Sequence, residues 1–456
     1  MKRLSALFLI AFGLFAAASP KRVELPRGLA DFESPVAVSR DVNVSDPPQG
    51  HIRSLAEWEE AEAIMTLWQN ESLLSAYTQH GKVKILTTSK GSWDNWLGSH
   101  GIDKSQVTYF NVRTDSMWIR DYGPWPVLDG NGVFGLVDTI YNRPRPNDDK
   151  VPHFMAKELN LPLYETGLVH TGGNYYNDGQ DNAFSSTLVY SENAQLSKGE
   201  IDSRMKSFLG IDRYTTSRLA PKATIEHIDT FGKLVAPDTW VFSEFPATSQ
   251  FRKDSEAYVA LLQTLRSPYG TPYKIHRMKM HRRSGARGDR AEDYRAYINS
   301  FISNKALFFP SYGDEIDDEA RAVYQAALPG YEIIGVNNEQ TSWGDSVHCR
   351  SRNLMKKNTV FLFPSVANGE LTVEAFASPG ARFEQNPVAH VEINGVTQDV
   401  PLEAAGENRF TANLGAKMGE QVRVYVTAKD SAGIEKVSPP GAPLQKIEYV
   451  SGDDHP

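Results

Sequence analysis

The chain has 456 residues, of which 40% are hydrophobic and 23% are charged. This length leaves room for two or more domains with their own buried cores. The formal net charge is −8, from 48 basic and 56 acidic residues, so bulk binding to nucleic acid is not expected. Cys349 is the single cysteine, which excludes an intramolecular disulfide and leaves one thiol whose use has to be explained.

The N-terminus has the pattern of a secretory signal peptide. A basic start is followed by an apolar run over 4–15 and by three alanines at 16–18. This pattern predicts a signal peptide over 1–18, too short for a membrane span, and therefore a secreted, extracellular protein. No other stretch approaches 18 consecutive apolar residues, so no membrane span is expected. Residues 19–50 are rich in Pro, Ser and Asp and predict an extended N-terminal arm.

Between residues 51 and 366, short β-rich runs alternate with helical ones, which is typical of an α/β domain. Strand candidates begin at 83 (VKILTT), 133 (VFGLVDTIY), 240 (WVFSEFP), 306 (ALFFPSY), 331 (YEIIGV) and 359 (TVFLFP). Helix candidates begin at 197 (SKGEIDSRMKSFLG), 255 (SEAYVALLQTLRSPYG) and 317 (DDEARAVYQAALPG), and the last two are expected to close on glycine. No strict sequence repeat is visible.

Residues 367–456 have a different pattern. LTVEAF, VAHVEING, NRFTANL and QVRVYVTAKDSAG are short alternating runs separated by Gly, Pro and Asn. Several such strands with turn signals predict a small β-sandwich, immunoglobulin-like in outline, although it contains no cysteine pair. The chain is therefore expected to consist of a catalytic α/β domain and a β module behind it.

Two kinds of charged segment are expected to be solvated. Residues 274–295 contain a dense basic run, which predicts an exposed loop. Asp148-Asp149 and the acidic stretch 314–319 are likewise interpreted as solvated, because their spacing does not match a calcium-binding loop. No metal and no other cofactor is expected, and any activity should be independent of calcium.

The first chemical candidates are Cys349 and the histidines. His348 is adjacent to the thiol, but neighbours on a strand point to opposite faces, so it is a poor partner. His227 and Asp229, in TIEHIDTFGKLVAP, are two residues apart and would face the same way in an extended segment. A cysteine peptidase using Cys349 and His227 is one reading of this set.

Additional candidates favour a different substrate. Asp121 lies among aromatic residues in TDSMWIRDYGPW, and HTGGNYYNDG at 170–179 has a Gly-Gly loop that would let a ligand approach the backbone. A peptidase needs an orienting group and an oxyanion hole rather than two spare carboxylates. A guanidinium group does need carboxylates, because its planar array of N–H donors pairs with them bidentately. Asp121 and Asp229 could bind the cation while a thiolate attacks its carbon.

Taken in order, several segments resemble the guanidine-modifying enzymes that include agmatine deiminase and the bacterial secreted peptidylarginine deiminase. These segments are TDSMWIRDYGPW, DTIYNRPRPNDD, HTGGNYYNDG, EHIDTFGKLVAP, INSFISNKALFFP, YEIIGV and VHCR. YNRPRPNDD and the order of signal peptide, catalytic domain and β-sandwich are similar to the secreted enzyme. The resemblance covers roughly 51–366 and implies a five-bladed α/β propeller, the pentein fold, with no cofactor.

The resemblance also implies roles for individual residues. The catalytic set is Cys349 as nucleophile, His227 as general acid/base, Asp121 and Asp229 as the guanidinium-binding pair, and Asn299 as a further active-site residue. Arg143 and Arg145 match arginines that receive a substrate α-carboxylate, and Trp118 and Ile225 are also expected to bind substrate. The implied reaction is deimination of peptidyl-arginine, preferably C-terminal, to citrulline and ammonia through a covalent thiouronium. The partners are then arginine-containing peptides or proteins.

Alternatives remain open from the residues. Glu226 stands where the family motif has asparagine, and Thr224 stands where an aromatic residue is expected, which leaves substrate selection undecided. An agmatine deiminase or another small-guanidine hydrolase would use the same chemistry. A secreted cysteine peptidase and a non-catalytic binding protein on the same scaffold are the remaining alternatives.

Overall fold

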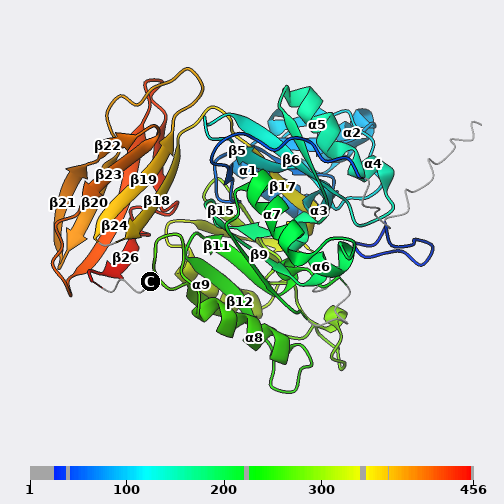
Figure 1. The fold of residues 1–456 in the computed structure, drawn as a ribbon. Coiled ribbons are helices and arrows are strands. Elements are labelled where there is room, and N and C mark those ends of the chain that lie inside the picture. The colour runs from blue at the N-terminus through cyan, green and yellow to red at the C-terminus, as the bar shows by residue number, and fades with distance from the viewer. Residues whose placement is uncertain (1–24, 37–41, 220–224, 339–345, 368, 453–456) are drawn as a thin grey trace, which may run out of the picture.

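A computed structural model describes residues 25–36, 42–219, 225–338, 346–367 and 369–452 (Figure 1). The predicted signal peptide over 1–18 and Thr224 lie outside these residues. Within them, no helix has both the length and the apolar character needed to cross a membrane.

In the described part of the chain, the strands before Phe361 form five small sheets. The first contains β1 (Arg53–Ser54), β5 (Trp125–Leu128), β6 (Phe134–Ile140) and β7 (Leu163–Val169), and the second β10 (Arg213–Ser217), β9 (Asn182–Ser186) and β8 (Tyr176–Asn177). The third contains β11 (Gly232–Ala236), β12 (Thr239–Glu244) and β13 (Lys274–Lys279), and the fourth β14 (Phe301–Ser303), β15 (Ala306–Ser311) and β16 (Glu332–Asn337). The fifth contains β17 (Ser351–Met355), β2 (Ala61–Thr66), β3 (Val83–Leu86) and β4 (Val107–Phe110).

Each sheet repeats one pattern that the sequence does not reveal. An antiparallel pair is followed by a parallel partner, as in β11–β12–β13 and β14–β15–β16. A helical crossover joins each parallel pair, as expected for strands that must run in the same direction. In the fifth sheet β17, from the end of the domain, pairs with β2, from its beginning. The sheets are separate, and none of them closes on itself.

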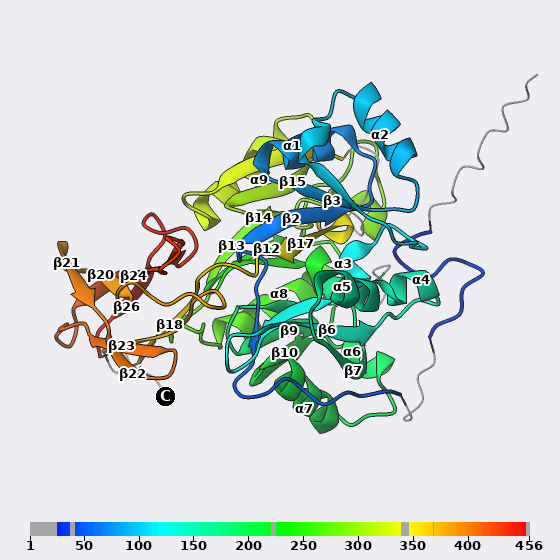
Figure 2. The same ribbon diagram turned by 90° about the horizontal axis from the view of Figure 1, so that it is seen from above.

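The helices lie between these strands and toward the outside (Figures 1 and 2). They are α1 (Glu71–His80), α2 (Lys90–Ser99), α3 (Ile119–Tyr122), α4 (Pro146–Asp149), α5 (Val151–Leu159), α6 (Leu188–Glu192), α7 (Lys198–Leu209), α8 (Arg252–Gln263) and α9 (Ile316–Ala327). Short 3-10 turns are η1 (Lys104–Gln106), η2 (Gly172–Asn174), η3 (Ile228–Thr230), η4 (Ala291–Asp293) and η5 (His348–Arg350).

Helix ends follow local chemistry only in part. α7 begins with a capping box in which Ser197 and Glu200 satisfy each other's backbone N–H groups, and it ends at Gly210 with a φ of 70°. The prediction that the next two helices close on glycine is wrong. α8 ends at Gln263 and α9 at Ala327, before the glycines at 270 and 330, and a proline that cannot continue a helix precedes each glycine, at 268 and 329.

The C-terminal part has two antiparallel sheets that share one apolar core (Figures 1 and 2). One sheet contains β18 (Phe361–Ala367), β19 (Glu370–Phe376), β23 (Arg409–Asn413) and β22 (Glu403–Gly406). The other contains β21 (Val396–Pro401), β20 (Val388–Ile393), β24 (Gln421–Lys429) and β25 (Glu435–Ser438), with β26 (Ile447–Val450) on β24. β18, which the sequence places at the end of the α/β domain, pairs with β19 and is therefore part of the first of these sheets.

The basic run over 274–295 is not wholly a solvated loop. Its first six residues form β13, which pairs in parallel with β12, and η4 lies near its end. The sequence signal is misleading because a strand at the edge of a sheet can expose basic side chains along one face.

Two acidic residues predicted to be solvated are buried. The Asp148 carboxylate accepts hydrogen bonds from the backbone N–H groups of Asp115 (2.7 Å) and Ser116 (3.1 Å) and from the Ser116 hydroxyl (2.6 Å). Asp317 accepts from the N–H groups of Tyr312 and Gly313 in the same way. Both carboxylates organise loops, and Asp148 fixes the segment that leads into α3.

Candidate active site

Four side chains predicted to carry the chemistry converge from separate parts of the chain. Asp121 lies on α3, His227 and Asp229 lie at the start of η3, and Cys349 lies on η5. α3 contacts η5, and η2 contacts both α3 and η3, so short turns from distant segments meet at one point. Each of the four residues is at most 2% exposed. The site is therefore buried at the centre of the larger domain.

A guanidinium group already occupies this point: the side chain of Arg27, from the N-terminal arm. Its Nε donates to Asp121 Oδ2 at 3.0 Å, and its Nη2 donates to Asp121 Oδ1 at 3.0 Å. The same Nη2 donates to Asp229 Oδ2 at 2.8 Å. Arg27 is only 4% exposed. The predicted carboxylate pair thus binds a guanidinium, with bidentate geometry at Asp121.

The charge of Arg27 keeps both carboxylates ionised. Burial by itself would raise the pKa of Asp229, but Arg27 and the hydrogen bond from His348 outweigh burial and hold that pKa well below its ordinary value. Burial also opposes ionisation of Asp121, and Arg27 followed by His227 lowers its pKa. Each carboxylate therefore depends on a cation in the site, because an uncompensated buried charge is costly.

His227 is neutral beside this cation. Burial, together with the charge of Arg27, lowers the pKa of His227 to about 3. His227 Nδ1 lies 3.0 Å from Arg27 Nη2, and Nε2 lies 3.2 Å from Thr171 Oγ1. Because arginine can only donate, Nδ1 must accept, and the ring proton is then on Nε2. His227 therefore presents a base to one guanidinium nitrogen.

Asn299 positions the thiol. Cys349 Sγ lies 3.1 Å from Asn299 Oδ1 and 3.9 Å from Asp229 Oδ2. The same amide oxygen accepts the backbone N–H of Cys349 at 3.3 Å, while Nδ2 donates to the backbone carbonyl of Asp229 at 3.2 Å. Asn299 thus links the nucleophile candidate to the carboxylate that binds the guanidinium.

A second layer of charges supports Asp229 from behind. His348 Nδ1 is 2.8 Å from Asp229 Oδ2, and His348 Nε2 is 2.9 Å from Glu57 Oε2. Glu57 also pairs with Lys233 and, at 2.6 Å, with Arg120. Burial opposes ionisation of Glu57, but Lys233, Arg120 and His348 together hold its pKa well below the ordinary value. This network orients the carboxylate that contacts the guanidinium.

Arg143 and Arg145 bind the backbone on both sides of Arg27. Arg143 Nε donates to the carbonyl of Arg27 at 3.1 Å. Arg145 Nη2 donates to the carbonyls of Pro26 at 2.7 Å and Gly28 at 2.9 Å. The two predicted substrate-binding arginines therefore contact the polypeptide that carries the bound guanidinium.

The other predicted substrate-binding residues differ. Trp118 Nε1 donates to the carbonyl of Leu25 at 2.9 Å, so it also contacts the arm. Ile225 is buried, at 6% exposed, and its contact with a substrate stays a prediction. Glu226 has a φ of 51°, a left-handed conformation in which asparagine is enriched, which fits the asparagine of the family motif at this position.

Two local interpretations from the sequence need correction. His227 and Asp229 do face one ligand, but on a 3-10 turn and not on a strand. The argument that His348 points away from the thiol on a strand is also wrong in its premise, because His348 and Cys349 lie on η5. His348 is directed to Asp229 and Glu57, so it is a positioning residue for the site.

Sequence reasoning missed Arg27, Glu57, Arg120, Lys233 and His348 as parts of the site. Arg27 lies in a segment whose composition predicts only an extended arm. Glu57 and Lys233 are common surface residue types, and no spacing connects residues 176 positions apart. His348 carried a signal, since it stands beside the single cysteine. The others could be found only from the tertiary structure.

The Gly-Gly loop has the predicted role of allowing close approach. A Cβ atom on Gly173 would lie 1.8 Å from Arg27 Nη2, 2.6 Å from Asp121 Oδ1 and 2.9 Å from His227 Nδ1. These distances are shorter than any van der Waals contact. The backbone of η2 therefore forms one wall of the guanidinium site, and only glycine fits there.

Comparison with known proteins identifies the family of this chain. The profile of the family described as Porphyromonas-type peptidyl-arginine deiminase matches residues 53–354. The chain belongs to this family. The matched range includes the deiminase-site residues from Asp121 to Cys349 and ends before β18, so the arm and the C-terminal sheets lie outside it.

The individual proteins that this chain resembles share about a quarter of its residues or fewer over the aligned length. A protein of Enterococcus faecalis provisionally named an agmatine deiminase is 25% identical over 360 residues, covering 69% of this chain and 98% of its own length. The solved agmatine deiminase of Enterococcus faecalis is 21% identical, with a TM-score of 0.59, covering 66% and 95% of the two chains. A Porphyromonas gingivalis structure provisionally named an arginine deiminase is 22% identical, with a TM-score of 0.58, covering 66% and 98%. The pentein-type fold is shared with these deiminases.

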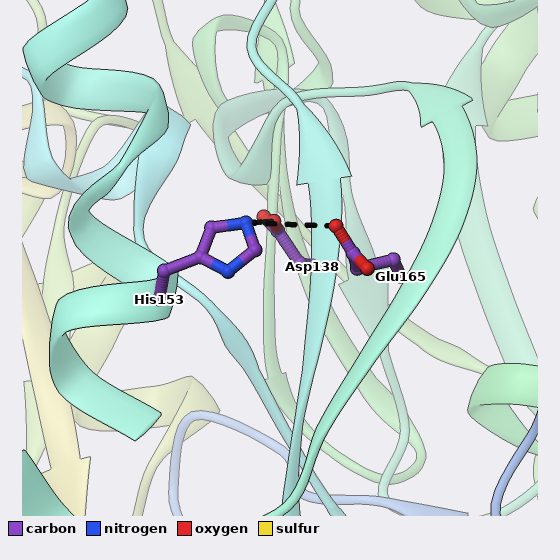
Figure 3. Close-up of side chains that lie close together, drawn as sticks. All are labelled: Asp138, His153 and Glu165. Carbon is purple, nitrogen blue, oxygen red and sulfur yellow. Dashed lines mark ion pairs between the residues drawn. The ribbon is translucent and has the colours of Figure 1, made fainter. Parts of the chain in front are cut away.

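A cluster of three titratable side chains lies away from the deiminase site. Among the described residues, Asp138 on β6, His153 on α5 and Glu165 on β7 are close enough to share an ion (Figure 3). His153 Nε2 is 3.5 Å from Asp138 Oδ2 and 3.6 Å from Glu165 Oε1. Burial, with the carboxylates of Asp149 and Glu165, raises the pKa of Asp138 to about 8. His153 thus lies near both acidic side chains, and among the described residues nothing else at this cluster indicates a metal.

The first prediction concerns Gly173→Ala. The added methyl group overlaps the guanidinium position, and overpacking costs about 1–3 kcal/mol, so kcat/KM for guanidine substrates should fall by about fivefold to a hundredfold. Gly199→Ala is the matched control, because a Cβ atom there meets nothing within 4 Å. Steady-state kinetics with unchanged circular dichroism would test this, and unaltered turnover in Gly173→Ala would contradict the placement of the substrate.

The second prediction concerns Asp138→Asn. The folded protein binds the Asp138 proton more tightly than the unfolded chain does, so this residue adds stability at low pH that is lost as the pH rises through about 8. The neutral amide should therefore raise Tm at pH 9 and give little gain in Tm at pH 4. The expected rise at pH 9 is about 2 °C or more, the shift that about 1 kcal/mol produces in a domain of 150–250 residues. Thermal melts at both values, with the exposed Asp46→Asn as control, would show whether the gain increases with pH.

Proposed function

We propose that this protein deiminates arginine residues within peptides or proteins to citrulline. Membership of the family and the guanidinium bound by Asp121 and Asp229 support a guanidine-modifying deiminase. The observation that carries the finer proposal is the chain around that guanidinium. The carbonyls of Pro26, Arg27 and Gly28 are all bound by side chains of the enzyme, which supports a substrate arginine with polypeptide on both sides.

Arg143 and Arg145 contact the backbone that carries the bound guanidinium, and we call this part of the molecule the site entrance. The positive charge of the entrance supports a peptide substrate over agmatine. Agmatine has an amine in place of the backbone, so it offers no carbonyl to Arg143 and Arg145. Its second cation would also lie close to two arginine side chains, and like charges disfavour each other. A peptide supplies the acceptors that these donors need, and a C-terminal arginine would supply a carboxylate.

Arg145 supports the expectation that a carboxylate can be bound. Its Nε and Nη2 donate to the two oxygens of Glu33 at 2.8 and 2.9 Å. A substrate α-carboxylate could take the place of Glu33, which would favour C-terminal arginine. The same residue also binds carbonyl groups, so internal arginine should be accepted as well.

The contacts of the site support the following reaction. Cys349 Sγ forms a bond to the guanidinium carbon, and its proton passes to the neutral His227. His227 then protonates the nitrogen that it contacts, the C–N bond breaks and ammonia leaves, giving a thiouronium. One water, deprotonated by His227, attacks the same carbon, the S–C bond breaks, and a ureido group remains. Asp121 and Asp229 hold the substrate cation in position throughout.

Agmatine deiminase is the second candidate, because the curated relatives carry that name. The two functions share the deiminase chemistry and differ at the entrance. The remaining finer proposals are that the five sheets form the blades of a propeller, that the C-terminal sheets form an immunoglobulin-like module, and that the protein acts outside the cell. The signal-like pattern over residues 1–18 supports the last.

Substrate comparison tests the proposed function. Two arginine peptides, one with internal and one with C-terminal arginine, should each be deiminated with a higher kcat/KM than agmatine. The expected difference is at least about tenfold, the factor that 1.4 kcal/mol provides. Arg145→Ala should reduce kcat/KM for peptides by the equivalent of about 1.5–3 kcal/mol for each charged hydrogen bond that is lost. It should leave kcat/KM for agmatine unaffected. The exposed Arg382→Gln is the control. A preference for agmatine in the parent enzyme would favour the second candidate.

Cys349→Ala tests the covalent mechanism. Loss of the nucleophile should reduce turnover of every guanidine substrate by at least about a thousandfold, while the fold is retained. Turnover and circular dichroism should be measured on the same preparation. Activity within about tenfold of the parent would show that another group carries the reaction.

A further inference from the structure

Residues 25–36 of the N-terminal arm are bound to the active site as a peptide ligand would be. Its carbonyls from Leu25 to Gly28 accept hydrogen bonds in succession from Trp118, Arg145, Arg143 and again Arg145. Its guanidinium contacts both carboxylates predicted to bind the substrate guanidinium, Asp121 and Asp229. The arm therefore uses both parts of the site, the carboxylates inside and the donors at the entrance.

Contacts further along the arm hold it in this register. Glu33 pairs with Arg145 through both carboxylate oxygens. The Ala30 N–H donates to Glu33 Oε2 at 2.7 Å, and the Glu33 N–H donates back to the Ala30 carbonyl at 2.8 Å. This turn places a carboxylate of the arm where Arg145 can bind it, so the arm is anchored on both sides of the buried guanidinium.

We propose that Arg27 is an intramolecular substrate: the enzyme deiminates its own arm, and conversion of Arg27 to citrulline releases the arm from the site. The proposal rests on the proposed function, since it requires an arginine within a polypeptide to react. It goes further in naming a modification site in this chain and in assigning the arm as a ligand that blocks added substrates until it has reacted.

The self-reaction balances with what the site contains. Cys349 Sγ attacks the Arg27 carbon, and Nη2, which contacts His227 and lies against Gly173, leaves as ammonia. One water then displaces the sulfur, so the guanidinium becomes a neutral urea and the thiol is restored. No oxidant, reductant or metal is required.

Loss of charge supplies the reason for release. Arg27 is the cation that both buried carboxylates, Asp121 and Asp229, contact. A urea retains the shape of the side chain but cannot balance two ionised carboxylates. Before reaction, the arm competes strongly with added substrates because it belongs to the same chain, which gives it a high effective concentration. After reaction, a cationic substrate should displace it.

Peptide mapping by mass spectrometry tests the modification. In the purified full chain, residue 27 should be found as citrulline, whereas Cys349→Ala should retain arginine there. The exposed Arg382 should remain arginine in both proteins. Arginine at position 27 in a preparation that converts added peptides overturns the proposal and leaves the proposed function standing. Citrulline at position 27 without turnover of any added peptide supports the self-modification and overturns the proposed function toward other peptides.

Mixing shows whether the reaction is intramolecular. Heavy-nitrogen-labelled Cys349→Ala chain is incubated with unlabelled active enzyme, and the labelled Arg27 peptide is followed by mass. Its arginine should persist, because each arm lies in its own site. Conversion of the labelled arm at the rate of an added peptide would overturn the intramolecular assignment.

Binding tests the blocking role without turnover. In a Cys349→Ala background, Arg27→Gln replaces the cation with a neutral group similar to citrulline. An arginine peptide blocked at both ends should bind the double variant at least about tenfold more tightly by calorimetry, because the intramolecular competitor is weakened. Arg382→Gln in the same background should bind as Cys349→Ala does. Equal affinity in the Arg27→Gln and Arg382→Gln double variants would overturn blocking by the arm.

Discussion

Two buried carboxylates that face one cation are the constraint on which the site depends. Asp121 and Asp229 are almost fully buried, and burial opposes the ionisation of each. Their charge is stable only while a guanidinium lies between them, which is also what makes the pocket selective for that group. In this structure the protein's own Arg27 satisfies the constraint.

The surrounding structure maintains this arrangement with a second layer of buried ionisable groups. Behind Asp229 lies His348, and behind His348 lies Glu57, whose carboxylate is balanced by Lys233 and Arg120. Glu57 and the two cations beside it therefore offset part of the cost of removing each other from water. The reacting groups stand on short turns that connect separate sheets, so the packing of several sheets determines their spacing to within a hydrogen bond.

The entrance to the site has a different chemistry from its interior. Inside, carboxylates contact a cation; at the entrance, Arg143 and Arg145 donate to carbonyls and to the carboxylate of Glu33. This division explains how deiminase chemistry shared with distant relatives can be combined with a substrate of its own. The interior determines that a guanidinium reacts, and the entrance determines what that guanidinium is attached to.

Much of the local structure and the identity of the chemistry were predictable from the sequence. Periodicity located strands such as β6, β12 and β15, and the ordered motifs indicated Asp121, His227, Asp229, Asn299 and Cys349. The pairing of β18 with the C-terminal strands was not predictable, because an apolar strand pairs equally well with either neighbour until the sheets are formed. α8 and α9 end before Pro268 and Pro329, so the proline and not the later glycine is the sequence signal near these helix ends.

By itself, the sequence determined the residue types that the reaction needs, because a thiol, an imidazole and two carboxylates in recurrent local motifs are readable without knowing their neighbours. Only the tertiary structure decided what those groups contact. The ion pairs of Glu57 and the insertion of Arg27 join residues far apart in the chain, and no local pattern encodes such pairs. Their physical cause is burial: once Asp121 and Asp229 are removed from water they require a cation, and the fold determines that the arm supplies it.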